Sequence, residues 1–380
     1  MEIAAVWAPQ LVAVMARTCR RLHMEGIRLL LSHRVVLVRK TQLVSFCNFM
    51  LTDNTDRRFL LWRGCFSLGV RYISTDISSL LFDVLNRCGN THVTNLQLWH
   101  ATELLDSDPR LSSAFTSFTR LDVVFVGLQR GDRGGTRFLR SLRSPLKTVR
   151  LSLPMLAYSQ RAHSKSRVIY ARNADPLWLL SKFSATLQVV AVDGDVTIGG
   201  CQQQFLHMIE LSVEQALPLV RPLVASLPNL RILKFTAVVQ MRRRENLLVM
   251  RSFVGKDFTT RECREINLRD QHTHGTWTTL DMLQAPIVTA YAAALLCRIK
   301  TLHLLGCKGR PAVELSMLLS VIQEARPAHL RLVFDMQEVE YIASVARLPA
   351  AAFFNSFELR LLTRDQTTGF DACFVSCATS

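Results

Sequence analysis

One short pattern recurs along most of this 380-residue chain and constrains its fold more than any other feature. It is a strand-like piece with apolar residues two apart, followed by a turn and then by an apolar stretch of helical length. Alternating apolar residues indicate a half-buried strand, whose buried side chains need a second layer to cover them. The strand pieces are residues 95–98, 120–123, 148–151, 189–192, 208–211, 232–235, 301–304, 329–332 and 356–359. Their alternation with helical stretches predicts an α/β fold.

An apolar anchor stands three residues before the first strand leucine, or its equivalent, in most of these pieces. The anchors are Val93, Phe118, Leu146, Leu187, Leu206, Leu230 and Ile299. In a solenoid the strand buries alternate side chains and the anchor fills the next layer, which explains an L-x-x-L-x-L spacing. Several separations between equivalent strand positions fall between about 24 and 28 residues, within the range of leucine-rich repeats. They are Leu96 to Leu121, Leu121 to Val149, Ile209 to Leu233, Leu302 to Leu330 and Leu330 to Phe357. We therefore expect an irregular, leucine-rich-repeat-like solenoid of horseshoe shape over residues 41–380.

The repeats are interrupted by two longer gaps, from Val149 to Val190 and from Leu233 to Leu302. We expect basic insert loops there, near residues 157–175 and 240–280. An ordinary α/β domain without solenoidal stacking is the alternative. Against a doubly wound nucleotide-binding domain, no glycine-rich phosphate turn of the form G-x-G-x-x-G or G-x-x-x-x-G-K-[ST] occurs.

The chain is strongly basic, with a formal net charge of +16. Such a charge favours acidic partners, including nucleic acid and acidic proteins. Arginine supplies most of it, and one dense cluster is Arg137, Arg140, Arg143, Lys147 and Arg150. No aromatic platform or nucleic-acid motif accompanies the clusters, so solvated surfaces and a polyanion site both stay open as readings.

Ten cysteines lie far apart and mostly inside apolar runs. Free buried cysteine behaves as a small hydrophobe, and the pattern suits a reducing compartment. No uninterrupted apolar run reaches the length of about 18 residues that a spanning helix needs. We expect no membrane partner and a cytoplasmic or nuclear location, or both.

Two groups of residues could be considered as metal ligands. The first is Cys263 with Asp270, His272 and His274, and the second is Cys373 with Cys377. A structural zinc site needs a second close pair of ligands, which neither group has, so we expect no metal and no cofactor. Signatures such as G-x-S-x-G and H-E-x-x-H are missing too, and we expect a chain that is not an enzyme. A hydrolase whose residues meet only in space remains an alternative.

The segment from Leu11 to His23, L-V-A-V-M-A-R-T-C-R-R-L-H, resembles the latter half of an F-box. The Leu-Pro opening of that family has no counterpart in residues 1–10. Together with irregular leucine-rich repeats, the segment is similar to fungal F-box-like proteins. The resemblance implies that Leu11, Val14 and Met15 face a Skp-type adaptor of a cullin-RING ubiquitin ligase. The alternative reading makes residues 1–40 a helical cap that covers the first repeat, and the two readings are compatible.

The sequence thus predicts a substrate-recruiting adaptor of an SCF-type ubiquitin ligase, which binds an unknown protein target through the concave strand face of its solenoid. The alternative is a basic scaffold that binds protein or nucleic acid without any ligase association.

Overall fold

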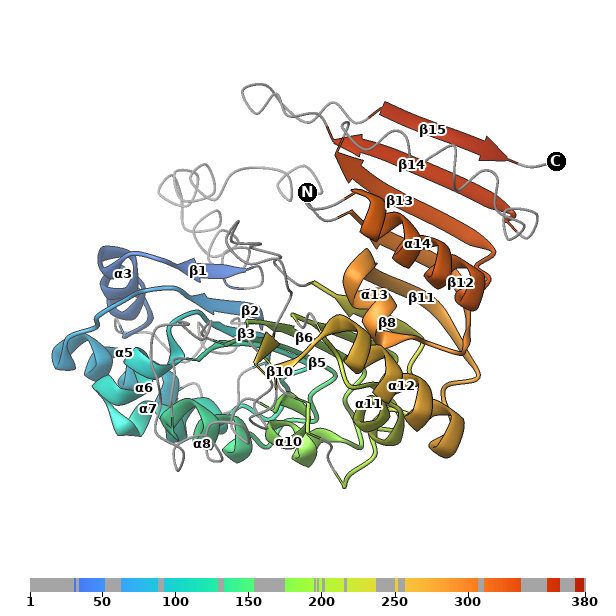
Figure 1. Cartoon of the computed structure of the whole chain (residues 1–380). Coiled ribbons are helices and arrows are strands. Elements are labelled where there is room, and N and C mark those ends of the chain that lie inside the picture. The colour runs from blue at the N-terminus through green and yellow to red at the C-terminus, as the bar shows by residue number, and fades with distance from the viewer. Residues whose placement is uncertain are drawn as a thin grey trace. The chain divides into compact units, whose positions relative to one another are not determined.

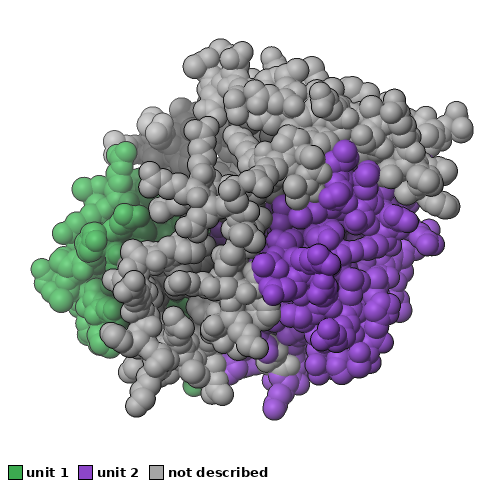
Figure 2. All heavy atoms as spheres, in the orientation of Figure 1, with its two compact units in different colours: residues 1–154 green, residues 155–380 purple. Residues whose placement is uncertain are grey.

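The chain divides into two compact units, residues 1–154 and residues 155–380 (Figure 2). The computed structural model describes residues 31, 34–51, 63–87, 92–128, 133–153, 175–194, 196, 198–199, 202–214, 217–236, 250–251, 257–306, 311–335, 354–362 and 373–378.

In unit 1 the strands lie in chain order, and each neighbouring pair is parallel. The strands are β1 (Val35–Leu37), β2 (Arg63–Leu68), β3 (His92–Leu98), β4 (Val123–Gly127) and β5 (Thr148–Ser152). The helices are α3 (Lys40–Leu51), α5 (Thr75–Arg87), α6 (Ala101–Ser107), α7 (Pro109–Thr116) and α8 (Arg133–Ser141). These helices pack side by side along one face of the strands (Figure 1).

Unit 2 repeats the arrangement, and among the described strands of its main sheet only the last one is antiparallel to its neighbour. The strands are β6 (Val189–Asp193), β7 (Glu210–Val213), β8 (Ile232–Phe235), β11 (Thr279–Pro286), β12 (Arg298–Leu305), β13 (His329–Asp335), β14 (Ser356–Leu362) and β15 (Cys373–Ala378). The helices are α10 (Pro176–Leu179), η2 (Ser181–Phe183), α11 (Val220–Ser226), α12 (Thr260–His274), α13 (Ile287–Ala293) and α14 (Pro311–Ala325). Strands β9 (Met250–Arg251) and β10 (Asp257–Phe258) form a separate antiparallel pair.

The fold is therefore α/β, with twelve parallel sheet strands in the described part of the two units, and its repeated strand–helix units are arranged as in a solenoid. The predicted spacing accounts for the core. In β3 the anchor Val93 and the pair Leu96 and Leu98 are all fully buried. Because each parallel neighbour repeats this pattern, the buried side chains stack in layers between the strands and the helices.

Two predicted strands have a different register from the one expected. Residues 120–123 were expected as a strand, yet β4 begins at Val123 and buries Val124 and Val126, while Leu121 is the anchor. Similarly, β7 begins at Glu210, not at Met208. A long apolar run can be fitted to the L-x-x-L-x-L pattern in two ways. The chain adopts the one in which its buried pair lies next to the buried pairs of the neighbouring strands.

The predicted anchor Leu206 is wrong, since Leu206 is 54% exposed whereas Met208 is fully buried. Met208 lies three residues before Leu211 and takes the anchor position, with Leu211 and Val213 as the buried pair. Ile209, on the opposite side, is 42% exposed.

The second expected insert loop, residues 240–280, contains regular structure in its second half. Residues Thr260–His274 form α12, which begins at a capping box: Thr259 Oγ1 accepts from the Glu262 N–H, and Glu262 Oε2 accepts from the Thr259 N–H at 2.7 Å. The helix ends at Gly275, whose φ of +86° favours glycine. The other expected insert, residues 157–175, lies outside the described residues except for Asp175.

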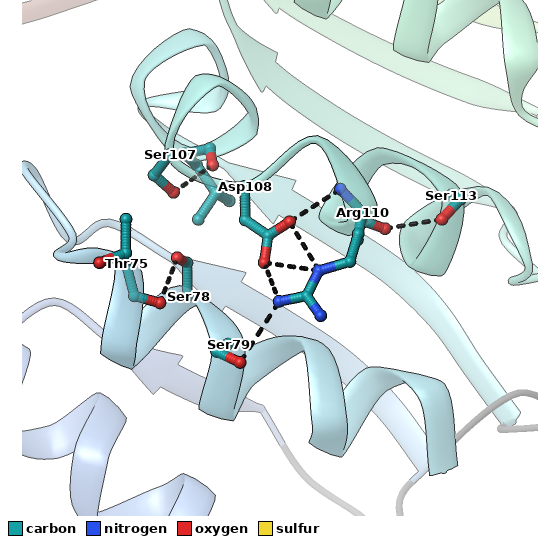
Figure 3. A network of polar contacts seen from close by, with 8 residues as sticks. Thr75, Ser78, Ser79, Ser107, Asp108, Arg110 and Ser113 are labelled. Carbon is teal, nitrogen blue, oxygen red and sulfur yellow. Dashed lines mark hydrogen bonds and ion pairs between the residues drawn. The ribbon is translucent and has the colours of Figure 1, made fainter.

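A polar network joins α5 to α7 in unit 1 (Figure 3). Asp108 is the N-cap of α7 and accepts from the Arg110 N–H at 2.9 Å. The Arg110 guanidinium bonds the same carboxylate, reaches Ser79 on α5 and lies over the Phe82 ring, 4.5 Å from its centroid. The Arg110 hydrogen bonds hold the pKa of Asp108 below its ordinary value. These contacts fix neighbouring repeats to each other on the helix side.

Candidate binding surface

On the strands of the main sheet whose side chains the structure describes, the residues that alternate with the buried core residues lie on the face of the sheet opposite the helices. We call this side of the strands the open face. Parallel register brings equivalent positions of neighbouring strands within about 5 Å, so open-face side chains form rows across each unit. A row is a composite surface that no single repeat possesses.

In unit 1 two rows define the centre of the open face. The first contains Val36, Ser67, Gln97, Phe125 and Arg150, and the second contains Val38, Gly69, Trp99, Gly127 and Ser152. A third row contains Arg34, Cys65, Asn95, Val123 and Thr148. None of the three rows contains an aspartate or a glutamate.

Trp99 is the central side chain of this face. Its ring centroid lies 4.4 Å from that of Phe125, and its Nε1–H donates to Ser67 Oγ at 3.4 Å. Phe125 and Ser67 are buried, whereas Trp99 remains 49% exposed. The indole is therefore held in place from two neighbouring strands and still offers much of its surface to a partner.

Two glycines flank Trp99 in its row. A Cβ at Gly127 would lie 2.1 Å from the Trp99 carbonyl oxygen, so only glycine allows β4 to approach β3 this closely. A Cβ at Gly69 would lie 3.3 Å from a Val38 methyl and 3.7 Å from the indole, so Val38 and Trp99 both border the space above Gly69. The valine and the indole thus form one apolar patch.

The open face of unit 2 is charged, and its charges pair with each other. Lys234 Nζ lies 2.7 Å from Glu210 Oε1, which joins β8 to β7. Glu358 on β14 accepts from Arg360 Nε at 2.8 Å and lies 3.3 Å from Arg331 Nε on β13. These pairs link neighbouring strands and neutralise much of the charge of that face.

His303 lies in the same row as Arg331, on the neighbouring strand β12. Burial, together with the charge of Arg331, lowers the pKa of His303 to about 4. The imidazole is therefore neutral at neutral pH. Its Nε2 is buried and has no hydrogen-bond partner in the described part of the chain.

The three predicted adaptor-binding residues, Leu11, Val14 and Met15, lie outside the described residues, and so does the whole F-box-like segment up to residue 30. The described part of the expected cap region is Leu31 together with residues 34–40, which include β1 and the start of α3.

The first group of candidate metal ligands is not brought together. Cys263 is buried, and its Sγ–H donates to the Pro218 carbonyl at 3.5 Å, while His272 and His274 are exposed. Among the residues that the structure describes, no group of three His, Cys, Asp or Glu side chains could hold a metal. Burial raises the pKa of Cys47 to about 12 and that of Cys263 to about 11, so neither thiol is an activated nucleophile at neutral pH.

The arginine cluster between residues 137 and 150 divides between two faces. Arg137 and Arg140 belong to α8 on the helix side, whereas Arg150 belongs to β5 and the open face. Lys147 pairs with Asp122 at 3.0 Å. Adjacency in the sequence therefore overstated the density of positive charge at any one place. None of the helices in the described ranges is long and apolar enough to cross a membrane.

Comparisons with protein-family models, with curated proteins and with solved structures give no match for this chain.

Proposed function

We propose that this chain is a non-enzymatic binding scaffold that recruits a protein target through its open strand face. The observation that carries the proposal is the row of side chains around Trp99. The indole packs against the buried Phe125 ring on one side and is 49% exposed. Aromatic residues with one accessible face are enriched at binding hot spots. Rigid rows on a parallel sheet also keep their geometry before binding, which lowers the entropic cost of association.

The machinery served is proposed from the F-box resemblance of residues 11–23. In this proposal Leu11, Val14 and Met15 contact a Skp-type adaptor, and the chain acts as the target-recruiting component of a cullin-RING ubiquitin ligase in the cytoplasm or nucleus. Residues 1–40 also cap the first repeat, and the repeats curve into a horseshoe whose concave side is the open face.

Co-purification with a Skp-type adaptor tests the ligase role. Wild type should retain the adaptor, and the double variant Leu11→Asp/Met15→Asp should lose it. Leu206→Asp/Ile209→Asp is the matched control, because it places the same two charges at exposed apolar sites of unit 2 and should keep the adaptor. Failure of wild type to retain the adaptor, with a folded protein by circular dichroism, would refute the ligase role.

The alternative function, a basic scaffold for nucleic acid, draws on the exposed arginines. Binding to nucleic acid should weaken steeply between low and moderate salt, because counterion release drives it. If the chain binds no nucleic acid at low salt, this alternative is excluded.

A further inference from the structure

We infer that the Trp99 surface of unit 1 binds an acidic segment of a protein partner, with an apolar partner residue stacked on the indole and acidic residues paired to three surrounding arginines. The Trp99 surface comprises Trp99, Val36, Val38, Arg34, Arg71 and Arg150. The inference rests on the proposed function, because it specifies the class of protein target that the open face recruits.

The apolar part of this surface is unusual for the chain. Of the six large apolar residues that are exposed in the described part, four belong to unit 1: Val36, Val38, Tyr72 and Trp99. Val36 on β1 is 41% exposed, and Val38, directly after β1, is 54% exposed. Val38 and Trp99 both border the space above Gly69. Clustered exposed apolar side chains on a folded surface indicate a place where another molecule is bound.

Three arginines surround this apolar centre. Arg150 lies next to Phe125 in the row, on the β5 side. From the β1 side, an Arg34 N–H donates to Gln97 Oε1 at 2.7 Å, which holds its guanidinium over the strands. At the carboxyl ends of the strands, Arg71 Nε–H donates at 3.0 Å to Nε2 of His100, the residue that follows Trp99 in the sequence.

Charge complementarity identifies the partner's chemistry. None of these three arginines forms an ion pair with a carboxylate in the described part of the chain, and the three rows contain no acidic residue. Burial and the nearby Arg71 lower the pKa of His100, so His100 accepts the Arg71 hydrogen bond without adding charge of its own. A partner must therefore supply the negative charges, and guanidinium groups pair with carboxylates through charge-assisted, often bidentate hydrogen bonds.

The shape of the surface favours a protein segment over a nucleic acid. Non-specific binding of single-stranded nucleic acid uses successive aromatic platforms, whereas the rows hold a single exposed aromatic ring. Its neighbours on the β1 side are valines, which suit aliphatic or aromatic side chains better than successive bases. An extended acidic peptide crossing the strands would place one apolar residue at Trp99 and acidic residues within reach of Arg34, Arg71 and Arg150.

Selection from a displayed library of random dodecapeptides against the full chain tests the inference. Selected peptides should be enriched in Asp and Glu around an apolar residue. By fluorescence anisotropy, Trp99→Ala should weaken their binding about tenfold or more, as expected of a central aromatic anchor. Arg150→Glu should weaken it by a similar factor without touching the packing of the indole, which separates loss of binding from loss of folding.

The matched control is Arg137→Glu, which makes the same charge change at an exposed site of α8 on the helix side. It should change peptide affinity less than about twofold. Selected peptides without acidic enrichment, or with equal affinity for wild type, Trp99→Ala and Arg150→Glu, would overturn the inference.

Labelled oligo(dT) is the competing probe. If oligo(dT) binds the chain more tightly than the selected peptides do, and Trp99→Ala abolishes that binding, the surface is assigned to nucleic acid instead. Adaptor co-purification with Trp99→Ala separates the two proposals, because the ligase role requires residues 11–15 and not Trp99. Retention of the adaptor together with failure of the peptide test would refute this inference alone.

Discussion

The side chain of Asn267 on α12 should make a larger contribution to stability than any exposed polar residue of unit 2. It is fully buried, and Asn267 Oδ1 accepts from the Val220 N–H at 2.9 Å. Its Nδ2 donates to the carbonyls of Pro218 and Ala292, each at 2.8 Å. One amide thus connects the start of α11, the helix α12 and the end of α13.

Asn267→Ala would leave these backbone groups without their partner inside the protein. Pro218 keeps a weak donor in the Cys263 thiol, so the Val220 N–H and the Ala292 carbonyl are the two that become unsatisfied. A buried unsatisfied backbone group costs about 1–3 kcal/mol, which gives an expected loss of about 4 kcal/mol in the free energy of unfolding of unit 2. Asn229→Ala is the control, because Asn229 also donates to a carbonyl, that of Leu206 at 2.8 Å, but at an exposed site where water replaces it.

Urea unfolding followed by tryptophan fluorescence measures the loss, and hydrogen exchange locates it. Trp277 is a suitable reporter, since its buried Nε1–H donates to the Leu227 carbonyl at 2.7 Å. Exchange should accelerate in residues 217–227 and 287–296 of Asn267→Ala and stay unchanged in unit 1. A loss below about 1 kcal/mol, equal to that expected for Asn229→Ala, would refute the reasoning.

Two further predictions concern the open face. Burial and the charge of Arg331 lower the pKa of His303 to about 4, so the folded state disfavours the protonated imidazole. The neutral imidazole therefore contributes fully to stability above the ordinary pKa of 6.5, and this contribution is lost as the pH falls from 6.5 toward 4. His303→Gln should therefore flatten the fall of the urea midpoint over that range, and a fall as steep as in wild type would contradict the assignment. Gly127→Ala should destabilise unit 1 by about 2–3 kcal/mol, because its Cβ would meet the Trp99 carbonyl and β4 would have to move. Gly275→Ala is the control, because nothing lies near its Cβ position and only its positive φ is unfavourable for alanine; it should lower the free energy of unfolding by about 1 kcal/mol. Equal shifts in thermal unfolding temperature for the two variants would contradict the close approach of β4 to β3.

The repeat spacing predicted the layers of the core well and the exact strand limits less well. The pair Leu96 and Leu98 with its anchor Val93 has the predicted arrangement, because three strongly apolar residues in that pattern leave one alignment. Around Leu206 to Val213 two alignments compete, and the choice depends on which side chains face the neighbouring strands. That is a property of tertiary packing and not of the local pattern.

Strand β11 was missed for a related reason. Its buried positions are Leu280, Leu283 and Ala285, so the third leucine of the pattern is replaced by a small residue and is followed by Pro286. Register with β8 and β12, where Leu283 lies opposite Leu233 and Leu302, completes the strand. The helix α12 was expected as a loop because its buried face contains Asn267 and Gln271, polar residues whose partners are backbone groups distant in sequence.

The Trp99 surface could not be predicted from the order of residues, because its members lie on or directly beside β1, β2, β3 and β5 and are brought together only by the parallel register. Sequence proximity suggested a cluster of Arg137, Arg140 and Arg150, which the fold separates onto two faces. A usable signal was present in Trp99, a large aromatic directly after the buried pair Leu96 and Leu98. Alternation places such a residue on the open face, where it is more exposed than a core tryptophan would be.

The two open faces differ in how their charges are satisfied, and this difference indicates where a charged partner would bind. In unit 2 the carboxylates of Glu210 and Glu358 lie beside Lys234, Arg331 and Arg360, so an incoming acidic group would compete with pairs that already exist. In unit 1 two of the three arginines around Trp99, Arg34 and Arg71, have neutral hydrogen-bond partners, Gln97 and His100, which orient the guanidinium groups without neutralising them. An acidic partner would therefore gain more charge pairing at the Trp99 surface than at these three basic residues of unit 2. The net charge of the whole chain increases the rate of encounter. The arginines beside the exposed indole, which have no carboxylate partner among the described residues, would determine the place of binding.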